Sequence, residues 1–113
     1  MQPHDRQVLE HILDYCNDIE ECISRFGRDL VVFSDDKAYH DLISFYILQI
    51  GELSVRLSAE LRAASADMNW AQMKGMRNIV AHHYGSLKLD ILWKTAIDDI
   101  PVLKAFCLRQ LEQ

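Results

Sequence analysis

The sequence predicts an all-α protein, an up-and-down bundle of four long helices, or of five pieces if a proline interrupts the last one. Apolar residues recur at intervals of three and four along most of the chain, which is the period of an amphipathic helix. Four glycines and two prolines leave little material for the turns of a many-stranded sheet. With 113 residues, the chain is expected to form a single domain over 1–113.

The first half of the chain predicts two long helices. The first runs over about 5–26 and is ended by Gly27. Residues 28–33 are expected to be a connector with a short extended piece. The second helix runs over about 36–64, after an N-cap and first-turn acids supplied by Ser34-Asp35-Asp36. Between Leu42 and Ile50 it is apolar nearly all round, so we expect part of that surface to lie in a homodimer interface.

The second half predicts two more helices. Asn69 is a suitable N-cap for a helix over about 70–84, and Gly85 is expected to stop it. The last helical stretch runs over about 88–111, and Pro101 should kink or restart it.

The charge pattern separates one segment from the rest of the chain. The net charge of −5 argues against a protein that coats nucleic acid by bulk electrostatics. Within residues 70–94, however, four basic side chains stand against a single acid. Such a local excess of positive charge could receive a phosphate group.

Several other classes of protein are excluded by composition. Cys16, Cys22 and Cys107 lack CxxC spacing and stand in apolar stretches, so we expect buried thiols and no zinc site. The longest mostly apolar run, over 42–50, is too short to cross a bilayer. The N-terminus has neither the basic nor the apolar part of a signal peptide. We therefore expect a cytoplasmic protein that has no metal site and does not contact a membrane.

The segment 76–84, Met-Arg-Asn-Ile-Val-Ala-His-His-Tyr, is the unusual part of the chain. On a helix, His83 falls among the apolar residues, where a hydrogen-bonded core or wall histidine is the expectation. His82 shares the opposite half with Asn78 and with small residues that let a second helix approach, and Arg77 stands at the border. This arrangement suits a site shared across a two-fold axis. The alternative is a surface histidine beside an arginine that only forms a salt bridge.

Arg77, His82 and Tyr84 form the pattern Rx4HxY, which resembles the signature of HEPN-domain ribonuclease toxins of the HepT-like family. The resemblance is specific over about 36–111 and loose in the first helix. Leu53 departs from the family, which commonly has alanine there, but no motif residue is missing. The flanking features that agree are Ile50-Gly51-Glu52, Trp70, Gly75-Met76-Arg77-Asn78, Leu92-Trp93 and Ile100-Pro101-Val102-Leu103.

The resemblance implies a homodimer of HEPN-like helical bundles, with the motifs of both protomers lining one cleft. It implies the toxin of a type II toxin–antitoxin system, an endoribonuclease that needs no metal or other cofactor for cleavage. The implied partner is a minimal nucleotidyltransferase antitoxin, which consumes ATP and transfers AMP to Tyr84. Two alternatives remain open: a non-catalytic HEPN module that binds a nucleotide or docks a nucleotidyltransferase, and a helical dimer without any site.

The residue chemistry suits metal-free RNA cleavage. His82 is expected to act as base or acid, because imidazole titrates near neutral pH, and two copies in a dimer could supply both roles. Arg77 offers a permanently charged donor fork to phosphate oxygens. Asn78 and Lys74 are candidates for positioning the substrate. Glu52 is either a third such residue or a solvated charge.

Tyr84 is expected to lie close to Arg77. The two residues are seven positions apart, so on a continuous helix they would differ by only about 20° in direction. AMP on the phenol oxygen would then bring a phosphate to the guanidinium and an adenosine into the cleft.

Overall fold

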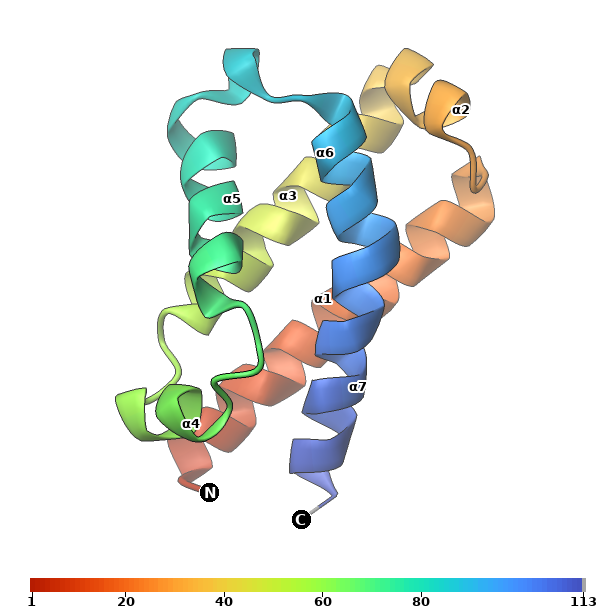
Figure 1. Cartoon of the computed structure of the whole chain (residues 1–113). Helices are drawn as coiled ribbons and strands as arrows, with labels where there is room; N and C mark the ends of the chain where they lie inside the picture. The colour runs from red at the N-terminus through yellow and green to blue at the C-terminus, as the bar shows by residue number, and fades with distance from the viewer. Residues whose placement is uncertain (113) are drawn as a thin grey trace.

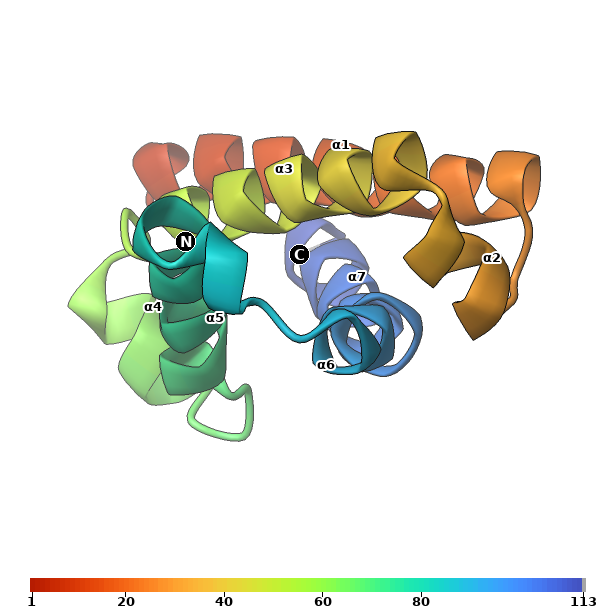
Figure 2. The same ribbon diagram turned by 90° about the horizontal axis from the view of Figure 1, so that it is seen from above.

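The computed structural model describes residues 1–112, which contain helices and no β-strand, so the predicted all-α class is confirmed. Helices α1 and α3 lie side by side and antiparallel in one layer, and α5 and the α6–α7 run lie on one side of it (Figures 1 and 2). The second layer crosses the first at an angle, a less regular arrangement than the predicted up-and-down bundle. The bounds are α1 Pro3–Phe26, α2 Leu30–Asp35, α3 Lys37–Ser54, α4 Ala59–Ala64, α5 Trp70–His82, α6 Leu89–Lys94 and α7 Ile100–Leu111.

The core lies between these two layers. Helix α3 packs on both α1 and α5, and α7 packs on α1. Burying each large apolar side chain contributes roughly 2 kcal/mol, so the core supplies most of the favourable free energy of folding. The largest fully buried aliphatic side chains are Leu9, Ile12, Ile19, Ile43, Ile47, Ile50, Leu57, Leu92, Ile100 and Leu103.

Gly27 ends α1 as predicted. Its φ of +118° is a backbone conformation that favours glycine, and its N–H donates to the carbonyl of Ile23. The Tyr39 hydroxyl donates to the Gly27 carbonyl over 2.9 Å. This bond fixes the turn after α1 to the buried side of α3.

The prediction of an extended connector over 28–33 is wrong, because residues Leu30–Asp35 form the short helix α2. The Asp29 carboxylate accepts hydrogen bonds from the N–H groups of Val31 and Val32 and so caps the helix. Phe33 is fully buried, and its ring packs against Tyr39 and Trp93 at centroid distances of 5.0 and 4.9 Å. Tertiary packing therefore outweighs the low helix propensity of the two valines.

The prediction of a single helix over 36–64 is also wrong, because α3 ends at Ser54 and α4 begins at Ala59. Asp36 caps α3 as predicted, through a hydrogen bond from the N–H of Tyr39. Ser58 caps α4, and the buried carboxylate of Asp5 accepts its N–H over 2.8 Å and its hydroxyl over 2.6 Å. The break is thus stabilised from the other end of the chain, by a residue in the first turn of α1.

Replacing Asp5 with asparagine should destabilise the fold by about 1–2 kcal/mol at neutral pH, because charged hydrogen bonds to Ser58 are lost. Burial alone would raise the pKa of Asp5, but the two hydrogen bonds from Ser58 lower it. Since the folded pKa is the lower one, this stabilisation is present above the pKa of the unfolded chain and is lost as the pH falls through the folded value. Urea unfolding of the wild-type protein and the Asp5→Asn variant at pH 7 and in acid measures this contribution. The difference between their free energies of unfolding should shrink on acidification, and a constant difference would contradict the assignment.

The last predicted helix is continuous over 89–111 but changes its winding. Thr95–Asp99 forms a π-helix between α6 and α7, closed by a bond from the Ile100 N–H to the Thr95 carbonyl. Pro101 follows in the first turn of α7, where its missing N–H costs little. The expected interruption thus takes the form of a change of winding just before Pro101, without a break in the helix.

The prediction of buried thiols is confirmed as well. Cys16, Cys22 and Cys107 are buried free thiols. Burial raises the pKa of all three, that of Cys107 to about 12. Among residues 1–112, no helix combines the length and the apolar character that crossing a bilayer requires.

Candidate functional site

The close approach of α3 and α5 builds the site. Gly51 of α3 is buried against α5: a Cβ at this position would lie 2.4 Å from Arg77 Cβ and 3.2 Å from the Met73 carbonyl oxygen. Only a glycine leaves room for the two helices at this distance. Asn69 caps α5 as predicted, by accepting a hydrogen bond from the Gln72 N–H. The stem of Arg77 therefore lies directly on the backbone of α3.

This approach brings two of the predicted site residues together. Arg77 Nη1 lies 3.3 Å from Glu52 Oε1, with the arginine side chain 19% exposed and the glutamate 41%. Arg77 Nε is buried and has no hydrogen-bond partner among the described residues. The ion pair engages Nη1, so Nη2 is the guanidinium nitrogen that could still bind an anion.

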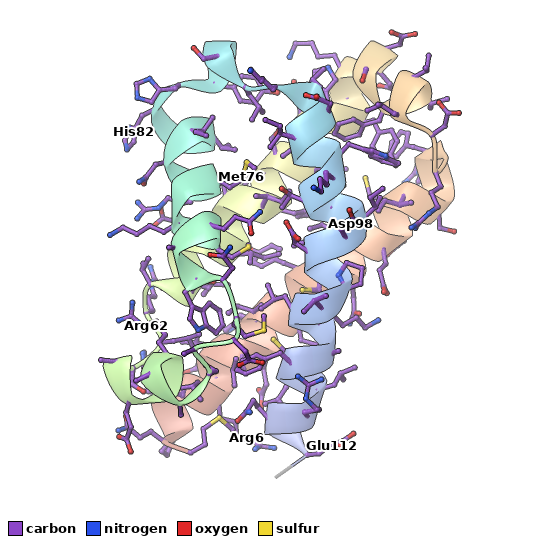
Figure 3. All side chains as sticks on the ribbon, viewed as in Figure 1. Arg6, Arg62, Met76, His82, Asp98 and Glu112 are labelled. Atoms are coloured by element: carbon purple, nitrogen blue, oxygen red, sulfur yellow. The ribbon has the colours of Figure 1, made fainter. Side chains whose placement is uncertain are left out.

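The outer face of α5 carries three further predicted residues. Lys74, Asn78 and His82 are all exposed and follow one another at intervals of four residues, so they form one line along the helix. His82 is the last residue of α5 (Figure 3). Within residues 1–112, no hydrogen bond or salt bridge engages these three side chains. The face predicted to carry small and polar residues is therefore exposed in the protomer.

The prediction for His83 is wrong. We expected α5 to continue to Tyr84 with His83 facing the apolar side, but α5 ends at His82 and His83 is exposed. His83 leaves helical geometry, with φ −137° and ψ 38°, while its N–H still bonds to the Ile79 carbonyl. The α-helix therefore ends here, and the next residues, Tyr84–Ser86, form a 3₁₀ turn.

The expected alignment of Tyr84 with Arg77 fails for the same reason. The Tyr84 hydroxyl instead donates a hydrogen bond to the carboxylate of Asp41 on α3, which also pairs with Lys37. Burial and then the hydrogen bond to Asp41 raise the pKa of Tyr84. Hydrogen bonds from Lys37 and Tyr84 lower the pKa of Asp41.

Asp41 is a partner of the motif tyrosine that the sequence analysis missed. Its salt bridge to Lys37 has the ordinary i, i+4 spacing of a helix surface, and nothing in that spacing indicates a role. Only the packing of α3 on α5 brings it to a tyrosine 43 residues away. In the part of the chain that the structure describes, no three His, Cys, Asp or Glu side chains gather as a metal site would require.

Comparison with known proteins gives the family. The profile of the family described as "Ribonuclease HepT-like" matches residues 12–109. The chain is 32% identical to "Probable ribonuclease HepT" of Thermococcus cleftensis over 97 residues, 80% of this chain and 87% of that protein. It is 29% identical to "Putative RNase TTE0752" of Caldanaerobacter subterraneus subsp. tengcongensis over 99 residues, which cover 88% of this chain and 87% of that one.

A further relative, "Putative RNase MJ1380" of Methanocaldococcus jannaschii, is 28% identical over 87 residues, 69% of this chain and 80% of that protein. No solved structure gives a significant match. The profile covers most of the chain, including all of α3, all of α5 and the motif residues Arg77, His82 and Tyr84. The chain therefore belongs to the HepT-like ribonuclease family.

Proposed function

We propose that this protein is the toxin of a type II toxin–antitoxin system, an endoribonuclease that cleaves RNA without a metal ion. The observation that carries the proposal is the placement of two motif residues on α5. His82 is exposed at the end of this helix, and Arg77 forms a salt bridge with Glu52 of α3. Family membership supports the reaction class.

In the proposed reaction, a 2′-hydroxyl of RNA attacks the neighbouring phosphorus and the bond to the 5′-oxygen breaks. One His82 takes the proton of the 2′-hydroxyl, and a second His82, from the partner protomer, gives a proton to the leaving 5′-oxygen. Arg77 stabilises the charge that develops on the phosphorane. The products are a 2′,3′-cyclic phosphate and a 5′-hydroxyl end.

Three further residues are proposed to position Arg77 or the RNA substrate. Glu52 keeps the guanidinium of Arg77 oriented, because it is the arginine's salt-bridge partner. Asn78 stands one turn before His82 on the same exposed line and can donate to a phosphate oxygen. Lys74 stands one turn further and adds a positive charge.

The same site needs a second protomer, so the proposal includes a homodimer. Phe45 is 48% exposed, and Leu42 and Leu48 are half-buried, which leaves apolar surface on the predicted stretch of α3. On α5, a Cβ at Gly75 would meet no atom of the same protomer within 4 Å. A second copy packing over these two helices would cover both features.

Replacing Gly75 with tryptophan should weaken this dimer, because the bulky side chain would occupy space that the second protomer needs. Sedimentation velocity of the wild-type and variant proteins over a range of concentrations measures the effect, and at least a tenfold loss in dimer affinity is expected, equal to about 1.4 kcal/mol. A wild-type protein that stays monomeric at micromolar concentration would contradict the homodimer.

Control of the toxin is proposed to act through Tyr84. A minimal nucleotidyltransferase antitoxin would catalyse attack of the Tyr84 oxygen on the α-phosphorus of ATP, with pyrophosphate as the leaving group. The carboxylate of Asp41, which already accepts the hydroxyl proton in a hydrogen bond, is placed to receive it. An esterified oxygen has no proton to donate, and its phosphate is repelled by Asp41, so the modified Tyr84 must leave α3.

Tyr84→Phe should abolish this modification, because no oxygen remains to accept AMP. Co-expression with a cognate nucleotidyltransferase, followed by intact-mass measurement, should show one or more AMP increments on the wild-type chain and none on the variant. The variant should stay toxic beside the partner if the hydroxyl is not needed for cleavage. An equal increment on both chains, or none on the wild-type chain with an active enzyme, would reject Tyr84 as the modified residue.

The test of the proposed activity is incubation of the purified chain with RNA in EDTA, beside a His82→Ala variant. The alternative is a non-catalytic HEPN module that binds a nucleotide or docks the nucleotidyltransferase. The exposed line on α5 favours a role in contacting a ligand in either case. A chain that binds nucleotide but leaves RNA intact would establish the alternative.

A further inference from the structure

A small cavity lies beside α5, away from Arg77 and Tyr84. It has a volume of about 240 Å³ and is formed where the end of α3, helix α4 and the start of α5 meet. Two of its residues, Arg62 and Lys74, are basic, and no acid lines it. The lining residues are Ser54, Val55, Arg62, Trp70, Ala71 and Lys74.

Arg62 shares a buried, unpaired Nε with Arg77 but, unlike Arg77, has no salt bridge among the described residues. Its Nε is shielded from solvent and has no hydrogen-bond partner, and its guanidinium forms no salt bridge to any of residues 1–112. Leaving a buried donor unpaired costs about 1–3 kcal/mol, more for charged groups, so such a donor indicates an absent partner. The nearby acids are turned elsewhere: Glu60 lines a different cavity together with Asp5, and Asp67 lines one together with Gln72.

The cavity and the line of exposed residues on α5 share one residue, Lys74. Lys74 is at once a wall of the cavity and the first member of the line that leads through Asn78 to His82. Figure 3 shows Arg62 and His82 at the same outer edge of the molecule, with α5 between them. Eight residues of helix separate Lys74 from His82, a rise of about 12 Å.

We propose that this cavity binds a backbone phosphate of single-stranded RNA, outside the linkage that is cleaved at His82. Arg62 would donate to the phosphate oxygens from the buried side and Lys74 from the solvent side. The indole N–H of Trp70 is already bonded to Ser65, so its half-buried ring can offer only apolar surface, against which a base can stack. The proposal deepens the proposed function, since it assumes that the cleaved linkage lies at His82.

The cavity explains how an acidic chain can hold RNA. With a net charge of −5, the protein gains little from long-range attraction to RNA. A second phosphate contact on α5 would supply local affinity and would fix the direction of the strand across His82. Contacts of this kind set the register of a nucleic acid without reading its bases.

The experiment measures RNA binding in the full chain carrying His82→Ala, so that cleavage cannot interfere. Arg62→Gln, Lys74→Gln and the double variant are compared with Arg109→Gln, which removes one charge from an exposed position on α7. Fluorescence anisotropy with a twelve-nucleotide and a three-nucleotide single-stranded RNA is recorded over a series of salt concentrations. Thermal unfolding of each variant checks that the fold is retained.

The double variant should bind the long RNA at least tenfold more weakly, while Arg109→Gln should bind it unchanged. The slope of log K against log salt should become shallower by about 0.7 for each lost phosphate contact. The three-nucleotide RNA, which can occupy only one of the two places at a time, should lose less affinity than the twelve-nucleotide RNA. Equal affinity and slope for the double variant and Arg109→Gln, or no binding of RNA by any variant, would overturn the proposal.

The outcome is separable from that of the proposed function. If the wild-type chain cleaves RNA through His82 and the glutamine variants bind it as the control does, only the cavity assignment fails. If the wild-type chain never cleaves RNA but binding depends on Arg62 and Lys74, the nuclease activity fails and the phosphate site stands.

Discussion

Replacing His82 with alanine is expected to lower the rate of RNA cleavage by about 10²–10⁴-fold, the contribution of a positioned acid–base residue. The fold should be unchanged, because the His82 side chain is exposed and makes no hydrogen bond within residues 1–112. The measurement is cleavage of a labelled RNA in EDTA, with circular dichroism and thermal unfolding to compare the folds. The products of the wild-type protein should carry a 2′,3′-cyclic phosphate or its hydrolysis product.

The neighbouring histidine provides a matched control. His83 is also exposed, but its side chain lies beyond the end of α5, so His83→Ala should keep nearly full activity. Arg77→Ala should lose activity as His82→Ala does, because the developing phosphorane charge loses its donor. If the wild-type protein and His82→Ala cleave equally, the activity belongs to a contaminant and the catalytic assignment is wrong.

The elements found correctly from the sequence are those specified locally. The heptad-like spacing of α1 and its terminal Gly27 lie within one stretch of chain, as do the Asn69 cap and the apolar face of α5. The placement of Arg77 and His82 on one helix belongs to this class. The pairing of Glu52 with Arg77 was not predicted, because the two residues stand on different helices, and the sequence analysis left the role of Glu52 open.

The errors fall where distant residues decide the local structure. The chain breaks before α4 because Asp5, 53 residues away, accepts both donors of Ser58. The helix α2 forms because Phe33 is buried between Tyr39 and Trp93. Long-range contacts of this kind are invisible to a pattern read along a single segment.

Tyr84 shows the same limit within the site itself. A helical wheel placed it next to Arg77, but one residue of non-helical backbone at His83 redirects it. Its hydrogen-bond partner, Asp41, comes from the opposite helix of the pair. The motif therefore supplies candidate residues, whereas the packing of the chain determines which of them meet.

That packing makes Gly51→Ala the substitution with the largest expected effect on stability. The new Cβ would overlap Arg77 Cβ at 2.4 Å and press on Arg77 Cγ at 2.9 Å and on the Met73 carbonyl at 3.2 Å. These atoms are backbone or the first atoms of a side-chain stem, so relief requires the two helices to separate. We expect a loss of about 2 kcal/mol or more in the free energy of unfolding, and a fall in Tm of about 10 °C.

Gly75→Ala is the matched control on the other side of the helix pair. Its Cβ would meet no atom within the protomer, so alanine there should leave the protomer's stability unchanged or raise it by up to about 1 kcal/mol through helix propensity. Any destabilisation by Gly75→Ala would have to come from a second copy, and it would then depend on protein concentration. Thermal unfolding of both variants at two concentrations separates these effects.

Gly51→Ala should also lower the rate of RNA cleavage. Separating α3 from α5 moves Glu52 away from Arg77, because this pair spans the two helices, and moves Asp41 away from Tyr84, which lies in the 3₁₀ turn directly after α5. Well below its own Tm, Gly51→Ala should therefore cleave RNA more slowly than the wild-type protein although every motif residue is present. Full activity in a destabilised Gly51→Ala protein would mean that the Arg77–Glu52 pair is dispensable, and that the arginine acts from a position set by α5 alone.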